Sequence, residues 1–95
     1  TDQQKSDIQI DLAEPIAQGQ YSNLAISNFS QEEFILDYLF LQPQVARAKV
    51  NSRIIMSPRN VKKLAQLLTA QVADYEKKYG VIQEEAQNRV QLNFN

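Results

Sequence analysis

The sequence predicts an α+β domain, in which a four-stranded antiparallel meander is followed by one long C-terminal helix packed on one face of the sheet. Three observations support this fold class. Four short stretches before residue 57 have strand-like patterning, one long amphipathic stretch follows, and the connections between neighbouring strands are short. Short connections favour antiparallel pairing of consecutive strands. The 95 residues suffice for one domain with its own core.

The first two expected strands lie near the N-terminus. Over residues 8–12, Ile8, Ile10 and Leu12 alternate with polar residues, which is typical of a strand with one buried side. The second expected strand covers Tyr21–Phe29, where apolar and small or polar residues alternate again. A Pro and a Gly between the two stretches prevent a longer element there.

The third and fourth expected strands are the more apolar pair. Phe34–Leu41 is the most apolar stretch of the chain, and its aromatic and branched residues favour a strand that ends before Pro43. A short helix is the alternative for this run, because its periodicity does not distinguish the two. Ala48–Met56 follows as the fourth strand, with alternating apolar and polar side chains.

The stretch Pro58–Tyr79 predicts a helix with defined ends. Ser57 suits the N-cap, Pro58 suits the first helical position, and Gly80 suits the residue that ends the helix. Apolar residues at helical spacing form one stripe along it, made of Val61, Leu64, Ala65, Leu68, Val72, Tyr75 and Tyr79.

The ends of the chain carry weaker patterns. Residues 1–6 are polar and are expected to form a loose end, so the single domain is expected to cover residues 7–80. Residues 81–95 are expected to form a C-terminal tail. Within it, residues 83–90 could form a weak helix, while the alternation of Val90, Leu92 and Phe94 is typical of a strand.

The composition excludes several classes of site. The chain has no Cys and no His, so disulfides, thiolate chemistry and Cys/His zinc sites are excluded, and the commonest general acid–base side chain is absent. The spacing of the carboxylates selects no pair of the kind that glycosidases use. We therefore expect a protein that is not an enzyme and that holds no metal or cofactor.

The charge and hydropathy give expectations about partners and location. With a net charge of −1 and no polybasic run, the chain has no electrostatic signature for nucleic acid or for an anionic membrane surface. No apolar run reaches the roughly 20 residues that span a bilayer. Residues 1–5 lack the apolar core of a signal peptide, and the absence of Cys suits a reducing compartment. A cytoplasmic location is therefore expected.

A family resemblance covers Tyr21–Gly80, about two thirds of the chain. The order and spacing of several short pieces resemble a family of short bacterial and archaeal proteins catalogued only as a domain of unknown function. The matching pieces are Tyr21–Ile26, Glu33–Tyr38, Pro43, Ala48–Val50, Ser52–Ile55, Ser57–Pro58, Tyr75–Glu76 and Gly80. The resemblance implies a compact cytoplasmic sheet-and-helix protein and no particular activity.

The expected strand order is also similar to that of the SecB-type export chaperones, which bind unfolded chains. This likeness lies at the level of the fold, so it gives only an analogy for function. It adds the binding of unfolded polypeptide segments as an alternative role.

The third expected strand has more apolar surface than the single expected helix can cover. Both sides of Phe34–Leu41 are apolar, apart from Asp37, and such strands are normally buried on both sides. One helix covers only one face of a sheet, so the other face needs a second cover. Three covers are considered: a second copy of the chain, a terminal segment that folds back, and a foreign polypeptide. Self-association is the leading interpretation.

The candidate contact surface follows from this mismatch. Its apolar contacts are expected from Ile35, Leu39, Leu41 and Ile55. Asp37 and Arg53 lie on strands expected to be neighbours, where Arg can bind a carboxylate through two parallel hydrogen bonds. This pair could give an interface its specificity, or it could be an ordinary cross-strand ion pair.

A basic cluster and the aromatic residues have less specific interpretations. Arg59, Lys62 and Lys63 lie in the first turns of the helix, where cationic side chains and free N–H groups could bind a small anion. No Gly-rich loop precedes them, so a solvated helix face is the favoured interpretation. The aromatic residues lie among Leu and Ile, which favours packing in the core over stacking on RNA bases.

Together these patterns predict a non-enzymatic protein-interaction module that forms a homodimer through the second face of its sheet. Binding of unfolded polypeptide segments is the first alternative. Binding of a small anion is the second.

Overall fold

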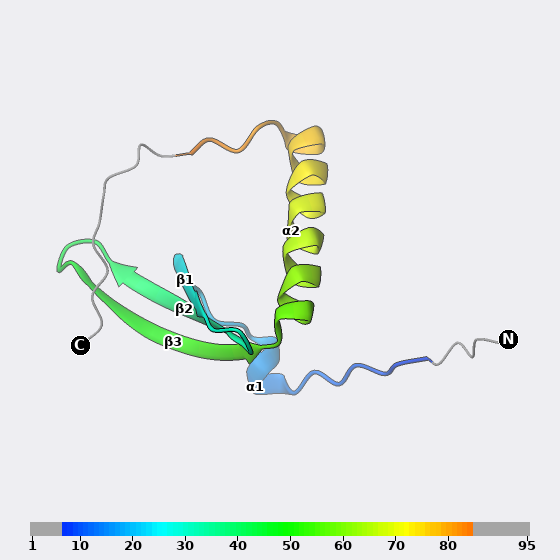
Figure 1. Cartoon of the computed structure of the whole chain (residues 1–95). Helices are drawn as coiled ribbons and strands as arrows, with labels where there is room; N and C mark the ends of the chain where they lie inside the picture. Colours follow the sequence, from blue (N-terminus) through cyan, green and yellow to red (C-terminus); the bar gives the residue numbers. More distant parts are fainter. Residues whose placement is uncertain (1–6, 85–95) are drawn as a thin grey trace, which may run out of the picture. The chain divides into compact units, whose positions relative to one another are not determined.

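The computed structural model describes residues 7–84 and has an α+β fold (Figure 1). Its elements in chain order are α1 (Glu14–Ala17), β1 (Leu24–Phe29), β2 (Phe34–Gln42), β3 (Arg47–Met56) and α2 (Pro58–Tyr79). The chain divides into two units, with the sheet in the unit that ends at Met56 and α2 in the unit that begins at Ser57. The predicted fold class is confirmed for a three-stranded antiparallel sheet and one long helix.

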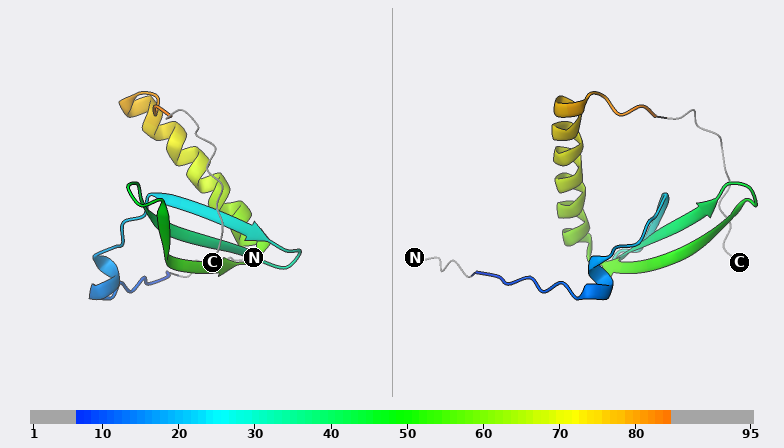
Figure 2. Two further views of the ribbon diagram at one scale, coloured as in Figure 1. Left: turned by 90° about the vertical axis from the view of Figure 1, so that its left-hand side faces the viewer. Right: turned by 180° about the vertical axis from the view of Figure 1, so that it is seen from behind.

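The three strands form an antiparallel meander in the order β1-β2-β3 (Figure 2). Phe34, the first residue of β2, lies opposite Phe29 of β1 and Met56 of β3. A tight connection joins β1 to β2, in which Ser30 N–H donates to the carbonyl of Glu33 (2.9 Å). The connection from β2 to β3 includes Ala46, whose φ of +49° is in the left-handed region that favours glycine.

A β-bulge in β3 determines which side chains share a face. Tyr38 lies opposite Ser52 and Leu39 lies opposite Val50, so Asn51 is the extra residue. Asn51 instead donates a side-chain hydrogen bond to the carbonyl of Tyr21 (3.3 Å). Because a one-residue shift moves each following side chain to the other face, the bulge places Val50 beside Leu39.

The first predicted strand, over residues 8–12, is wrong, so the sheet has three strands and not four among residues 7–84. The structure has no strand there, and Ile8, Ile10 and Leu12 are exposed. Alternation of side chains indicates a possible strand but supplies no partner for its hydrogen bonds. The chain instead forms the single helical turn α1, where the carbonyl of Ala13 accepts hydrogen bonds from the N–H groups of Ile16 (3.0 Å) and Ala17 (2.8 Å).

The second predicted strand is shorter than expected, because β1 begins at Leu24 and not at Tyr21. Just before it, side-chain hydrogen bonds add to one backbone bond, which the N–H of Asn23 donates to the carbonyl of Leu39 (3.1 Å). The Ser22 hydroxyl donates to the carbonyl of Leu39 (2.8 Å). The Asn23 amide donates to the carbonyl of Leu41 (3.0 Å) and accepts from the N–H of Leu41 (2.7 Å). These bonds reach across to β2, so Ser22 and Asn23 satisfy backbone groups of β2 beyond the end of β1.

The helix α2 has the bounds that the sequence predicts. Ser57 caps its first turn, where its Oγ accepts a hydrogen bond from the N–H of Asn60 (3.3 Å). At the other end, Gly80 has a φ of +100° and donates its N–H to the carbonyl of Glu76 (2.9 Å). The basic residues Lys77 and Lys78 lie in the last turn, where they complement the helix dipole.

The residues after α2 are described as far as residue 84. No helix or strand is present over 81–84, and the side chain of Glu76 accepts a hydrogen bond from the N–H of Ile82 (2.9 Å). Most of the predicted weak helix over 83–90, and the alternation of Val90, Leu92 and Phe94, lie outside the described residues.

Candidate interaction surface

The register of the sheet places all six predicted contact residues on one face. Antiparallel partners directly opposite each other have side chains on the same side of the sheet. Ile35 lies opposite Ile55, and Asp37 lies opposite Arg53. We call this side the Asp37 face. From β1, β2 and β3 it takes Leu24, Ile26, Asn28, Ile35, Asp37, Leu39, Leu41, Ala48, Val50, Arg53 and Ile55.

The ion pair at the centre of this face has the geometry that the sequence predicts. Nε of Arg53 donates to Oδ1 of Asp37 (2.8 Å), and the terminal nitrogen Nη2 donates to Oδ2 (2.9 Å). The Asp37 side chain is only 2% exposed, whereas the Arg53 side chain is 54% exposed. The pair therefore joins a carboxylate under the surface to a guanidinium that still reaches solvent.

The ionisation of Asp37 follows from this geometry. The hydrogen bonds from Arg53 lower the pKa of Asp37 below its ordinary value; burial acts in the opposite direction, and the positive charge of Arg53 adds to the lowering. The same contact raises the pKa of Arg53. Asp37 is therefore a charged, satisfied group near neutral pH and not a proton donor.

The apolar residues of the Asp37 face are covered to different degrees. Leu39 is 5% exposed and is the one buried hydrophobic residue among residues 7–84. Ile35 and Leu41 are half-buried, while Ile55 is 58% exposed. Within a single chain, the accessible part of the predicted contact surface is therefore the part contributed by β3.

The opposite side of the sheet carries most of the aromatic residues, and we call it the aromatic face. The Phe29 and Phe34 rings stack at 5.3 Å, and the Tyr21 ring meets Phe40 edge-on at 6.2 Å. The predicted packing of the aromatics in a core is wrong for several of them, since Phe29 is 75% and Tyr21 is 73% exposed. These rings are exposed because the three strands form a single layer.

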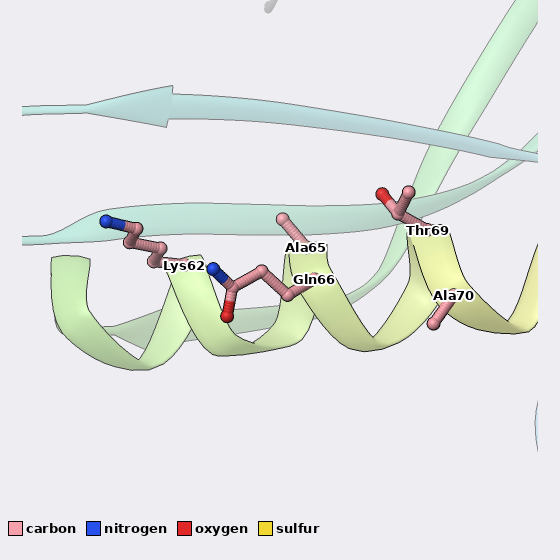
Figure 3. Close-up of a pocket in the computed structure, with 5 residues that line it drawn as sticks. All are labelled: Lys62, Ala65, Gln66, Thr69 and Ala70. Carbon is pink, nitrogen blue, oxygen red and sulfur yellow. The ribbon is translucent and has the colours of Figure 1, made fainter.

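The basic cluster of α2 does not converge on one pocket. A shallow depression on the helix is lined by Lys62, Ala65, Gln66, Thr69 and Ala70 (Figure 3). All five residues come from a single helix, and Arg59 and Lys63 are not among them. The anion site predicted at Arg59, Lys62 and Lys63 stays a prediction.

The described part of the chain lacks two other features that would point to a function. Over residues 7–84, no three Asp or Glu residues gather in a way that could hold a metal ion. Neither described helix has the length and apolar character needed to cross a bilayer.

Comparison with known proteins adds the family. The family model described as "Protein of unknown function (DUF3467)" matches residues 1–84. The chain belongs to this family. The match agrees with the resemblance seen over Tyr21–Gly80 and extends it toward the N-terminus.

No curated protein and no solved structure matches the chain. The expected likeness to SecB-type chaperones is therefore not supported. The strand order on which it depended is also absent, because three strands and not four precede α2 among residues 7–84.

Proposed function

We propose that this protein is a non-enzymatic protein-interaction module that self-associates through the Asp37 face of its sheet. One observation carries the proposal: among residues 7–84 a single hydrophobic residue, Leu39, is buried, while many large hydrophobic side chains are exposed. Burying a Leu or Ile side chain contributes roughly 1.5–3 kcal/mol. A second sheet placed on the first would supply the missing layer.

The charge pattern of the Asp37 face supports its use as a specific contact. Its one buried charge, Asp37, is already satisfied by Arg53, so covering the face leaves no carboxylate without a partner. The exposed guanidinium retains further N–H groups that can donate to a second chain. Across a two-fold axis, Ile55 would supply apolar contact and Arg53 would define the register.

Two finer features belong to the same proposal. We expect α2 to pack on one face of the sheet, as the sequence predicts. We also expect a cytoplasmic location, which the absence of Cys supports.

The test compares two neighbouring residues of β3. Ile55 and Ile54 are both exposed but lie on opposite faces. We expect Ile55→Lys to halve the mass measured by sedimentation equilibrium relative to the parent. Ile54→Lys, the matched control, should keep the parent mass. Circular dichroism should show both variants folded, because neither side chain is buried.

Two outcomes would remove the proposal. A parent chain that stays monomeric at millimolar concentration does not self-associate. Equal behaviour of the Ile54 and Ile55 variants would mean that the Asp37 face is not the contact. A monomeric parent that instead binds many unrelated apolar peptides, with loss of binding in Ile55→Lys, would favour the chaperone-like alternative.

A further inference from the structure

The apolar stripe of α2 contains a regular heptad seam. Six of its residues are alternately four and three positions apart, namely Val61, Ala65, Leu68, Val72, Tyr75 and Tyr79. This spacing keeps one narrow seam facing a partner helix along nearly the whole of α2. Within this seam, Leu68, Val72, Tyr75 and Tyr79 are 45–65% exposed.

We infer that α2 pairs antiparallel with α2 of a second copy through this seam. In that arrangement Leu68 meets Val72 of the partner subunit near the two-fold axis. Moving outward, Ala65 meets Tyr75 of the partner subunit, and Val61 meets Tyr79 of the partner subunit. Every layer joins a smaller side chain to a larger one, which is how facing side chains fill space evenly.

A parallel pair of the same helices would pack poorly. Each residue would then face its own copy, so the Ala65 layer would hold two methyl groups and leave a void. The Tyr79 layer would hold two rings and be crowded. Voids and overpacking both destabilise a packed interface. The order of side-chain sizes along α2 therefore selects the antiparallel direction.

The charges beside the seam select the same direction. Lys62 and Glu76 lie on the same side of the helix, 14 residues apart, which is about 21 Å along its axis, so they cannot pair within one chain. Antiparallel pairing brings Lys62 level with Glu76 of the partner subunit, and the two-fold axis repeats the contact. Glu76 accepts from the N–H of Ile82 through one oxygen, which leaves the other oxygen for Lys62.

This pairing does not use the whole apolar stripe. Leu64 lies beside the seam and Leu67 lies further around the helix, both on the side away from Lys62 and Glu76. They remain for the contact of α2 with the sheet that the proposed fold expects. The inference rests on α2 alone and is independent of self-association through the Asp37 face. Together the two contacts would join four chains.

A crosslinking experiment tests the pairing and its direction. The chain has no Cys, so Thr69→Cys and Lys62→Cys each introduce a single thiol, seven residues apart on the same side of α2. In the antiparallel pair, two copies of residue 69 lie about 3 Å apart along the helix axis, and two copies of residue 62 about 24 Å apart. With a short bismaleimide, we expect most of the Thr69→Cys chain to be covalently dimeric and several-fold less of Lys62→Cys.

Each other result overturns the inference. Equal crosslinking at the two positions would mean a parallel pair. No crosslinking at either position would mean that the seam packs elsewhere, for example on the sheet of its own chain. The same measurement in the Ile55→Lys background keeps this test separate from the proposed function, because loss of sheet contact alone leaves crosslinking at residue 69 unchanged.

A charge exchange provides the second readout. Lys62→Glu places like charges together in both symmetric contacts, so we expect the dissociation constant of the Ile55→Lys dimer to rise on the order of tenfold at low salt. Adding Glu76→Lys should restore the original value. Failure of the second change to rescue the first would contradict the antiparallel register.

Discussion

The two faces of the sheet are built from the same strands but differ in burial. The Asp37 face holds both buried residues of the described chain, Leu39 and the charged Asp37, whereas the aromatic face holds none. The aromatic face is nevertheless rich in large apolar side chains, including Phe29, Phe34 and Phe40. Burial here follows the number of close neighbours and the satisfaction of polar groups, not the hydrophobicity of each residue.

The largest effect should come from the buried centre of the Asp37 face. We expect Leu39→Ala to lower the free energy of unfolding by about 2–3 kcal/mol, because it removes a buried side chain and leaves a cavity. Leu36→Ala, on the aromatic face of the same strand, should cost clearly less because Leu36 is only half-buried. Urea denaturation measures both, and equal losses would remove the contrast between the faces.

An intermediate effect should come from acid. The carboxyl of Asp37 has a lowered pKa in the folded chain and an ordinary pKa of about 3.8 in the unfolded chain. Its ionic contacts therefore stabilise the fold above the ordinary pKa, and this stabilisation is lost as pH falls through the lowered folded value. The raised pKa of Arg53 leaves it charged throughout this range.

Denaturation curves between neutral pH and pH 3 should show this loss in the parent. Asp37→Asn removes the titrating group, so its stability should be lower at neutral pH and should change less with acid. If the parent and Asp37→Asn lose stability in parallel, other carboxylates account for the acid sensitivity.

The smallest effect should come from the aromatic face. Phe29 stacks on Phe34 but is 75% exposed, so we expect Phe29→Ala to cost only about 0.5–1 kcal/mol. Phe34→Ala should cost more, because the Phe34 ring is half-buried. A loss for Phe29→Ala as large as that for Leu39→Ala would mean that the aromatic face contributes as much to the free energy of unfolding as the Asp37 face.

Local signals predicted the elements that depend on neighbouring residues. The bounds of α2 follow from Ser57, Pro58 and Gly80, whose hydrogen bonds and dihedral angles act within one turn of the helix. The pairing of Asp37 with Arg53 was also predictable, because two opposite charges on adjacent strands of an apolar sheet have few other partners.

Features that depend on distant partners were not predictable in the same way. Ile8, Ile10 and Leu12 have the alternation of a strand, but a strand forms only where a neighbour accepts its hydrogen bonds, and none does among residues 7–84. The bulge at Asn51 decides whether Val50 or Asn51 lies beside Leu39, and no residue type marks it.

The sequence by itself therefore determined the α+β class, the ends of α2 and the partner of Asp37, because caps, helical periodicity and opposite charges act over short range. Only the tertiary structure decided the number of strands, the register across the bulge and which face holds the two buried side chains. Those features depend on contacts between segments far apart in the chain. All the strands that pair contribute to the free energy of those contacts, so no single segment determines them.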